Sequence, residues 1–129
     1  MSQTTTQFFI DFIQEYGSAW NNYDVDKIIS SYHTPCFIFK TGKLFTNLTE
    51  EAKKNYFYNL LVDYRRQGYA RAEIPQCDVK MLGKNSALVS VNWVCKKDDG
   101  TVVFDFWDSY HIVNMDGFWK ILDDTVHDE

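Results

Sequence analysis

The sequence predicts an α+β domain in which three helices pack on a strongly curved antiparallel sheet. Apolar residues recur at helical spacing only in the first half of the chain, up to about Gly68. From Arg71 onward, runs rich in Val, Ile, Phe, Trp and Tyr alternate with short turns that contain glycine, a pattern typical of strands. Helices that are segregated from an antiparallel sheet define an α+β architecture, because the sheet must bury one face against them.

The helices can be placed in order along the chain. Phe8 to Trp20 has the spacing of a first amphipathic helix. Asp24 is a favourable N-cap for a short second helix that continues to about Tyr32, and Pro35 is expected to end it. Thr49 caps a third helix, whose acidic first turn and basic last turn match the helix dipole.

The strands follow from turn chemistry. Residues 36–40 resemble a strand that turns back at Thr41-Gly42 into residues 43–45. A further strand runs from Arg71 to Leu82, in which Pro75 indicates an edge or a bulge. Three long strands then span residues 86–126, joined by loops in which Gly100 and Gly117 supply the positive φ angle.

The two loops predict a register for these three strands. Closing the first loop with Lys97 opposite Thr101, and the second with Asn114 opposite Phe118, fixes which side chains share a face. The concave face then carries Val89, Val91, Trp93, Trp107, Trp119 and Ile121, with Asp105, Ser109, His111 and Asp123 set among them. The convex face carries Leu88, Val94, Phe104, Phe106, Tyr110, Ile112 and Leu122, with Asn92, Asp108 and Asp124 among them. A slip of one residue would exchange the faces of a strand.

Length, charge and cysteine usage restrict the class of protein. Its 129 residues suit one domain, residues 1–129, with a core of its own. The net charge of −5 does not favour nucleic acid or an anionic membrane as a partner. The chain has no long apolar run and its first residues lack the features of a signal peptide, so we expect a cytoplasmic protein. Three widely spaced cysteines predict free buried thiols, and we expect no metal and no cofactor.

Three segments, together with the order of elements, carry a resemblance to a known family. They are Ala19–Asp24 between the first two helices, Tyr32–Cys36 entering the first strand, and Ser109–Val113 with Asp116–Ile121 at the end. This arrangement resembles the superfamily named after nuclear transport factor 2, and within it the SnoaL-like and ketosteroid-isomerase-like small proteins. The resemblance covers nearly the whole chain. It implies a cone-shaped (cystatin-like) fold with a pocket between the helices and the concave sheet face, and a homodimer.

The resemblance does not choose an activity. Members of the superfamily include isomerases, cyclases, dehydratases, epoxide hydrolases and non-catalytic binding or assembly modules, so the fold alone leaves the function open. One departure excludes a direct transfer of the steroid isomerase mechanism. Those enzymes have a catalytic aspartate on the first short strand, just before its turn, where this chain has Lys40 and no carboxylate between Pro35 and Asn47.

Four polar residues on the predicted concave face are the candidate chemical site. Buried polar groups are costly unless they are paired, so Asp105, Ser109, His111 and Asp123 need an explanation. They either form a solvated pocket floor or satisfy each other, helix ends or trapped water in a closed core. In the first case His111 would be a general base, Asp123 or Asp105 would be its partner or the acid, and Ser109 and a tyrosine would hold the substrate oxygen.

Aromatic residues and one lysine complete the predicted site. The candidate ligand contacts are Trp93, Trp107 and Trp119 on the sheet, Tyr16, Trp20, Tyr32 and Tyr58 on the helices, and Lys40. Core packing is the alternative for the helical aromatics, because their spacing is that of a buried stripe. The predicted function is binding of a small, largely apolar organic molecule, with cofactor-free proton transfer of the isomerase, dehydratase or cyclase type. The alternative is a non-catalytic ligand-binding or dimerisation module.

The three predicted strands of residues 86–126 are apolar on both faces, which indicates that the protein forms an oligomer. Helices can cover only one face of a sheet, and an exposed apolar patch on the other would exceed what soluble monomers usually carry. We therefore expect a homodimer through the convex face, formed by the same patch on each subunit. The alternative cover is the chain's own tail or first helix.

Overall fold

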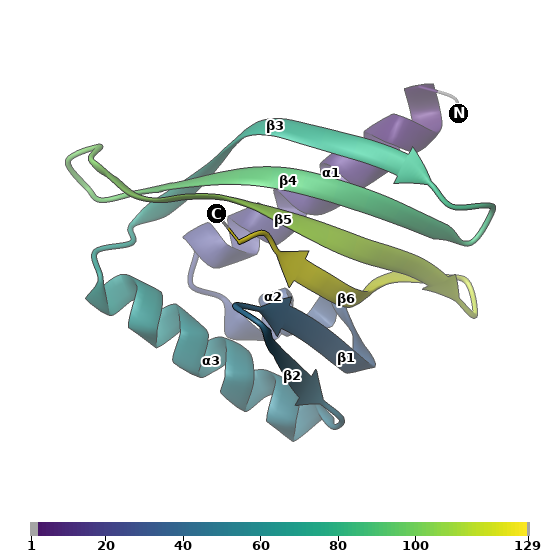
Figure 1. Cartoon of the computed structure of the whole chain (residues 1–129), viewed down its shortest axis with the longest axis horizontal. Coiled ribbons are helices and arrows are strands. Elements are labelled where there is room, and N and C mark those ends of the chain that lie inside the picture. The colour runs from purple at the N-terminus through teal and green to yellow at the C-terminus, as the bar shows by residue number, and fades with distance from the viewer. Residues whose placement is uncertain (1–2, 129) are drawn as a thin grey trace.

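The computed structural model describes residues 3–128 and has three helices packed on one face of a curved six-stranded sheet (Figure 1). The strand order is β2-β1-β6-β5-β4-β3. The α+β prediction is confirmed. The elements are α1 (Gln3–Asn21), α2 (Val25–Ser30), β1 (Tyr32–Lys40), β2 (Lys43–Asn47), α3 (Glu50–Arg66), β3 (Arg71–Met81), β4 (Ser86–Lys96), β5 (Val102–Met115) and β6 (Phe118–Val126).

The sheet is mixed rather than wholly antiparallel. β1 runs parallel to β6, whereas every other neighbouring pair is antiparallel. The antiparallel prediction came from hairpins, in which a short turn reverses the chain. No hairpin joins β1 to β6, because they are the first and last strands of the chain and meet only through the tertiary fold.

The helices begin where their caps predict. The Asp24 side chain accepts a hydrogen bond from the Lys27 backbone amide at 3.1 Å, and the Thr49 hydroxyl accepts one from Ala52 at the same distance. The second helix ends at Ser30, earlier than predicted, and Pro35 lies inside β1. The helix therefore ends before Pro35 is reached, and the proline is not what terminates it.

Side-chain hydrogen bonds connect helix α3 to the start of strand β1. The Lys53 side chain is almost fully buried, and its Nζ donates to the Tyr32 carbonyl at 3.0 Å and to the Thr34 hydroxyl at 2.9 Å. Glu50 lies 3.0 Å from the same Nζ and supplies the opposite charge. These contacts hold the start of β1, and so the Tyr32 ring, against α3.

The first loop of the meander closes as predicted, but a bulge follows it. The Lys97 amide donates to the Thr101 carbonyl at 2.9 Å, and Gly100 has a φ of 90°. Val102 then pairs with Lys96 and Phe104 with Cys95, so that Val103 has no opposite residue. Such a β-bulge inserts one extra residue in one strand. From Phe104 onward, every side chain of β5 lies on the face opposite to the predicted one.

The second loop is one residue shorter than predicted. Asp116 and Gly117 have φ values of 55° and 87°, and Met115 pairs with Phe118, which makes a two-residue hairpin turn. A second bulge at Leu122 follows, because Ile112 pairs with Ile121 and His111 pairs with Asp123. The faces of β6 are therefore as predicted up to Ile121 and exchanged after the bulge.

The predicted concave face is thus correct for one half of its members and wrong for the other. Val89, Val91, Trp93, Trp119 and Ile121 face the helices as predicted. Asp105, Trp107, Ser109, His111 and Asp123 lie instead on the convex face, because their strand neighbours point inward. The residues that replace them on the concave side are Phe104, Phe106, Asp108, Tyr110, Ile112 and Asp124.

Candidate functional site

A partly open cavity lies between the concave face of the sheet and helices α1 and α3. The centre of a water molecule can occupy about 60 Å3 of it, several times the roughly 10–15 Å3 that one ordered water needs. Ten of its eighteen lining residues are aromatic, so the walls are rigid and largely apolar. The lining residues are Tyr16, Trp20, Tyr32, Ile38, Lys40, Tyr56, Phe57, Leu60, Tyr64, Tyr69, Ala72, Trp93, Cys95, Phe106, Asp108, Tyr110, Asp124 and Val126.

Two buried carboxyl groups lie in the wall of this cavity. Asp108 on β5 and Asp124 on β6 are 5% and 4% exposed. They belong to adjacent strands, with Asp124 opposite Tyr110, and each carboxyl group affects the pKa of the other. The Oδ1 atom of each has no hydrogen-bond partner among residues 3–128. Buried polar atoms are nearly always paired, so two unpaired oxygens on adjacent side chains that line a cavity are an exception.

Burial changes the acidity of this pair. Loss of solvation raises the pKa of Asp108 to about 6. The same effect, increased by the charge of Asp108, raises the pKa of Asp124 well above its usual value. Because two carboxylates in contact cannot easily both ionise, the pair loses its two protons in two separate steps. Between these steps the cavity holds a carboxylic acid and a carboxylate side by side.

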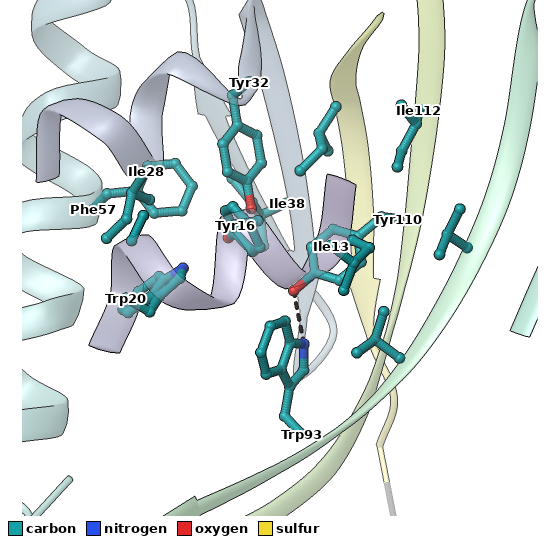
Figure 2. Packing of buried hydrophobic residues seen from close by; sticks show 14 of the residues in the cluster. Ile13, Tyr16, Trp20, Ile28, Tyr32, Ile38, Phe57, Trp93, Tyr110 and Ile112 are labelled. Carbon is teal, nitrogen blue, oxygen red and sulfur yellow. Dashed lines mark hydrogen bonds between the residues drawn. The ribbon is translucent and has the colours of Figure 1, made fainter. Parts of the chain in front are cut away.

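Tyrosine and tryptophan side chains surround the pair. The Tyr16 and Tyr32 hydroxyls share a hydrogen bond of 2.7 Å, and the Trp93 indole N–H donates to the Tyr110 hydroxyl at 3.0 Å (Figure 2). Burial raises the pKa of all three tyrosines well above the ordinary value, so they stay neutral phenols. Neutral phenols can donate as well as accept hydrogen bonds, which suits them to hold a polar group of a ligand.

Lys40 is the charged residue of β1 that lines the cavity. Its Nζ donates to the Tyr64 hydroxyl at 3.2 Å and lies 5.5 Å from the centre of that ring. Its positive charge lowers the pKa of both aspartates, against the larger effect of burial. A second hollow shares Lys40, Tyr56 and Leu60 with the cavity, so Lys40 lies where the two adjoin.

The predicted ligand-binding residues divide between the cavity and other places. Tyr16, Trp20, Tyr32, Lys40 and Trp93 line the cavity. Trp119 packs on Phe9, with ring centres 5.0 Å apart, and contributes to the core instead. Tyr58 is on the outer side of α3 and is 56% exposed. Trp107 and Ser109 lie on the convex face, as described above.

His111 and Asp123 do meet, but outside the cavity. His111 Nδ1 lies 2.9 Å from Asp123 Oδ2, and its Nε2 lies 2.7 Å from Ser86 Oγ. The two residues are directly opposite each other, on the convex face rather than on the predicted concave one. Their catalytic role, and that of Asp105, stays a prediction, since chemistry at these groups would be separate from the cavity.

Other polar residues of the convex face are also paired among themselves. The Ser109 hydroxyl bonds to Ser90 and to His127 Nε2, each at 2.7 Å. Asp105 accepts a hydrogen bond from the Asn92 amide at 3.0 Å. These contacts match the alternative in which the polar residues satisfy one another.

Sequence reasoning missed Asp108 and Asp124, although the sequence contained a signal for them. The predicted register left Phe104, Phe106, Tyr110 and Ile112 together on the uncovered face. Moving β5 by one residue would have buried those four apolar side chains, and Asp108 with them. A comparison of the two registers by apolar burial would therefore have indicated Asp108, whereas the position of Asp124 also depends on the bulge at Leu122.

Three other features of the described residues concern metal-binding clusters, cysteines and membrane-spanning helices. Among residues 3–128, no group of three or more His, Cys, Asp or Glu side chains is placed to hold a metal ion. The three cysteines are free, and burial raises the pKa of the Cys36 thiol to about 11 and of Cys95 to about 12. Within the same part of the chain, no helix is both long and apolar enough to cross a membrane.

Solved structures of the same fold include proteins of different kinds. An NTF2-like protein of unknown function from Shewanella oneidensis superimposes with a TM-score of 0.76 at 20% identity, covering 96% of this chain and 99% of that one. A protein proposed to be a ketosteroid isomerase, from Shewanella frigidimarina, has a TM-score of 0.69 at 15% identity, with 91% and 92% covered. The association domain of CaMKII from C. elegans has a TM-score of 0.74 at 12% identity, with 98% and 97% covered.

At these identities the similarity shows the fold alone. No curated protein matches the sequence. The sequence does match one family, described as NTF2-like protein (DUF6841), over residues 6–129. Nearly the whole described chain, including both strands of the aspartate pair, is within that match, and we conclude that this protein belongs to the NTF2-like family.

Proposed function

We propose that the cavity binds a small, largely apolar organic molecule whose polar group contacts Asp108 and Asp124. The observation that carries the proposal is the unpaired Oδ1 of each aspartate in an otherwise aromatic wall. Apolar pockets with a few convergent polar groups and shifted pKa values are the usual form of a small-molecule site. Coarse support comes from the fold, since NTF2-like proteins serve as ligand-binding or catalytic modules.

The pair supports cofactor-free proton transfer as the chemistry of such a site. As a carboxylate, Asp108 would remove a proton from a carbon next to a carbonyl group. As a carboxylic acid, Asp124 would donate a hydrogen bond or its proton to the carbonyl oxygen. A carboxylic acid that its surroundings keep neutral can stabilise a developing oxyanion in this way. Isomerisation, dehydration and aldol-type cyclisation all share this first step.

The second candidate is a non-catalytic ligand-binding or assembly module. It is favoured by Lys40, which occupies the position where the resemblance expects a catalytic aspartate. The similarity in fold to an association domain is compatible with it. The two candidates differ in turnover and not in binding, so one experiment can separate them.

The test uses 2-butanone, which has a four-carbon apolar body and one carbonyl group. Binding is followed by the indole N–H signals in a 15N NMR titration, because Trp20 and Trp93 line the cavity whereas Trp107 and Trp119 do not. Catalysis is followed by exchange of the hydrogens beside the carbonyl with D2O. We expect exchange above the buffer rate, reduced at least tenfold in Asp108→Asn and unchanged in Asp78→Asn, which removes an exposed aspartate on β3.

Each result has a defined meaning. Shifts at Trp20 and Trp93 without exchange would favour the non-catalytic module. No shift at either indole with 2-butanone, at any concentration up to solubility, would contradict a ligand that is recognised through a carbonyl group.

We also propose that the protein is a cytoplasmic homodimer that pairs through the convex face of its sheet. The patch differs from the predicted one, because Phe104, Phe106, Tyr110 and Ile112 face the helices. The outward-facing apolar side chains are Phe39, Leu88, Val94 and Trp107. An isologous interface would place this patch against its own copy.

A further inference from the structure

We propose that the polar group recognised in the cavity is a protonated amine, so that the ligand class is a small alkylammonium compound. The inference rests on the proposed ligand site and specifies its chemistry. It follows from the balance of donors, acceptors and charge in the cavity wall.

The wall has acceptors that lack donors. The Oδ1 atoms of Asp108 and Asp124 are unpaired within the described part of the chain, and both side chains are at least nine-tenths buried. A ketone oxygen can accept a proton from the pair but brings no donor to these two atoms, and a carboxylate brings no donor either. An alkylammonium group brings two or three N–H donors on one nitrogen, enough to reach both carboxyl groups.

Charge in the cavity favours the same group. None of the ion pairs within residues 3–128 includes Asp108 or Asp124. The Lys40 ammonium, the lysine in the wall, is hydrogen-bonded to the Tyr64 hydroxyl instead. A buried carboxylate is stable only when it is paired or neutralised, and a proton shared by the two carboxyl groups is one way to neutralise it. A ligand cation would take the place of that proton.

The aromatic side chains of the cavity would also contribute to the affinity for an ammonium group. The faces of Trp and Tyr rings attract cations, by about 0.5–2 kcal/mol where the cation is desolvated. The rings of Tyr16, Trp93 and Tyr110 adjoin one another, with the Tyr16 ring 6.1 Å from that of Trp93 and 5.6 Å from that of Tyr110 (Figure 2). These three rings line the same cavity as the two aspartates, so an ammonium group in the cavity would have an aromatic surrounding that also favours its charge.

Four probes with one carbon skeleton test the proposal. They are 2-butylamine, 2-butanol, 2-butanone and 2-methylbutanoate, each titrated at pH 7.5 while the four indole N–H signals are recorded. We expect the amine to shift the Trp20 and Trp93 signals and to bind at least tenfold more tightly than the alcohol, with the carboxylate weakest. Trp107 and Trp119 serve as internal controls, because they lie outside the cavity.

Variants identify the groups responsible. Asp124→Asn, or Asp108→Asn if the first variant fails to fold, should weaken the amine at least tenfold and change the alcohol less than threefold. Lys40→Met should strengthen amine binding, because it removes a like charge from the wall. Asp78→Asn matches the charge change on the exposed side of β3 and should leave both affinities unchanged.

The outcomes separate the two proposals. If the alcohol or the ketone binds as tightly as the amine, or if Asp124→Asn leaves the amine affinity unchanged, the amine assignment is overturned while the ligand site stands. If no probe shifts Trp20 or Trp93, the ligand site itself is overturned.

Discussion

At the scale of single residues, two aspartates are the groups of this protein best suited to acid–base chemistry. Asp108 and Asp124 are buried beside each other in an apolar wall and lose their protons in two separate steps. Removing carboxyl groups from water favours their neutral form, so the fold maintains an acid and a base at the same place. The histidines on the convex face have more solvent around them, since His111 is 31% exposed.

The pair makes stability depend on pH in a direction that can be worked out. Both folded pKa values are raised, so above about pH 4, where an unfolded aspartate ionises, the folded state binds more protons than the unfolded state. Stability therefore falls as the pH rises through about 6, the pKa of Asp108. Asp124→Asn should raise the free energy of unfolding by about 1–3 kcal/mol at pH 7.5.

The measurement is urea unfolding of the variant and the wild type at pH 4, 6 and 7.5. The gain in Asp124→Asn should shrink towards pH 4, where both proteins hold neutral groups at this position. Asp78→Asn is the control, and its difference from the wild type should stay nearly constant. A gain that is the same at all three pH values would show that burial of charge is not its cause.

At the scale of elements, two β-bulges decide which side chains the sheet presents to the helices. Val103 and Leu122 each add one residue to a strand without a partner opposite. The first exchanges the faces of β5 and the second exchanges the faces of the last part of β6. Asp108 and Asp124 face the cavity together only because both bulges are present.

The position of the first bulge gives a prediction about deletions. Deleting Val103 removes the unpaired residue and leaves every other pair of β4 and β5 in place, so the protein should fold with a loss of only about 1–2 kcal/mol. Deleting Ser109, which lies between paired residues, turns the following side chains to the wrong face and should prevent folding.

Circular dichroism and 15N NMR spectra distinguish the two deletions. The Val103 deletion should keep the Trp93 indole signal at its wild-type position, because the bond to Tyr110 is retained. Loss of that signal in a folded Val103 deletion would place the register change elsewhere.

At the scale of the whole molecule, the sheet has one face in the core and one towards solvent. The convex face combines apolar side chains, among them Phe39 at 43% and Leu88 at 36% exposure, with hydrogen-bonded serine, histidine and aspartate side chains. This mixture resembles a subunit interface more than a core, because interfaces of independently folded subunits retain many polar groups.

The dimer proposal is tested by light scattering at micromolar concentration. The wild type should have twice the chain mass of 15.2 kDa. Trp107→Lys places a charge on the convex face and should weaken the dimer at least tenfold, whereas Leu48→Lys, in the exposed loop before α3, should not. A wild-type mass equal to one chain at these concentrations would exclude the dimer.

The sequence by itself determined the helices, the turns and the family. Helix caps such as Asp24 and Thr49, apolar spacing and turn glycines act over a few residues, so they can be recognised without the fold. The same local rules correctly placed Tyr16, Trp20 and Trp93 against the cavity. At the helix caps the hydrogen bonds that mark the structure join near neighbours in sequence.

Only the tertiary structure decided the register, the parallel pairing of β1 with β6, and hence the site. An unpaired residue in a bulge needs no special side chain, and nothing in the type of Val103 or Leu122 distinguishes it from a paired strand residue. The bulges are selected by the burial of Phe104, Phe106, Tyr110 and Ile112 against helices that are distant in sequence. The same burial brings Asp108 and Asp124 inward, because alternate residues of a strand must share its face.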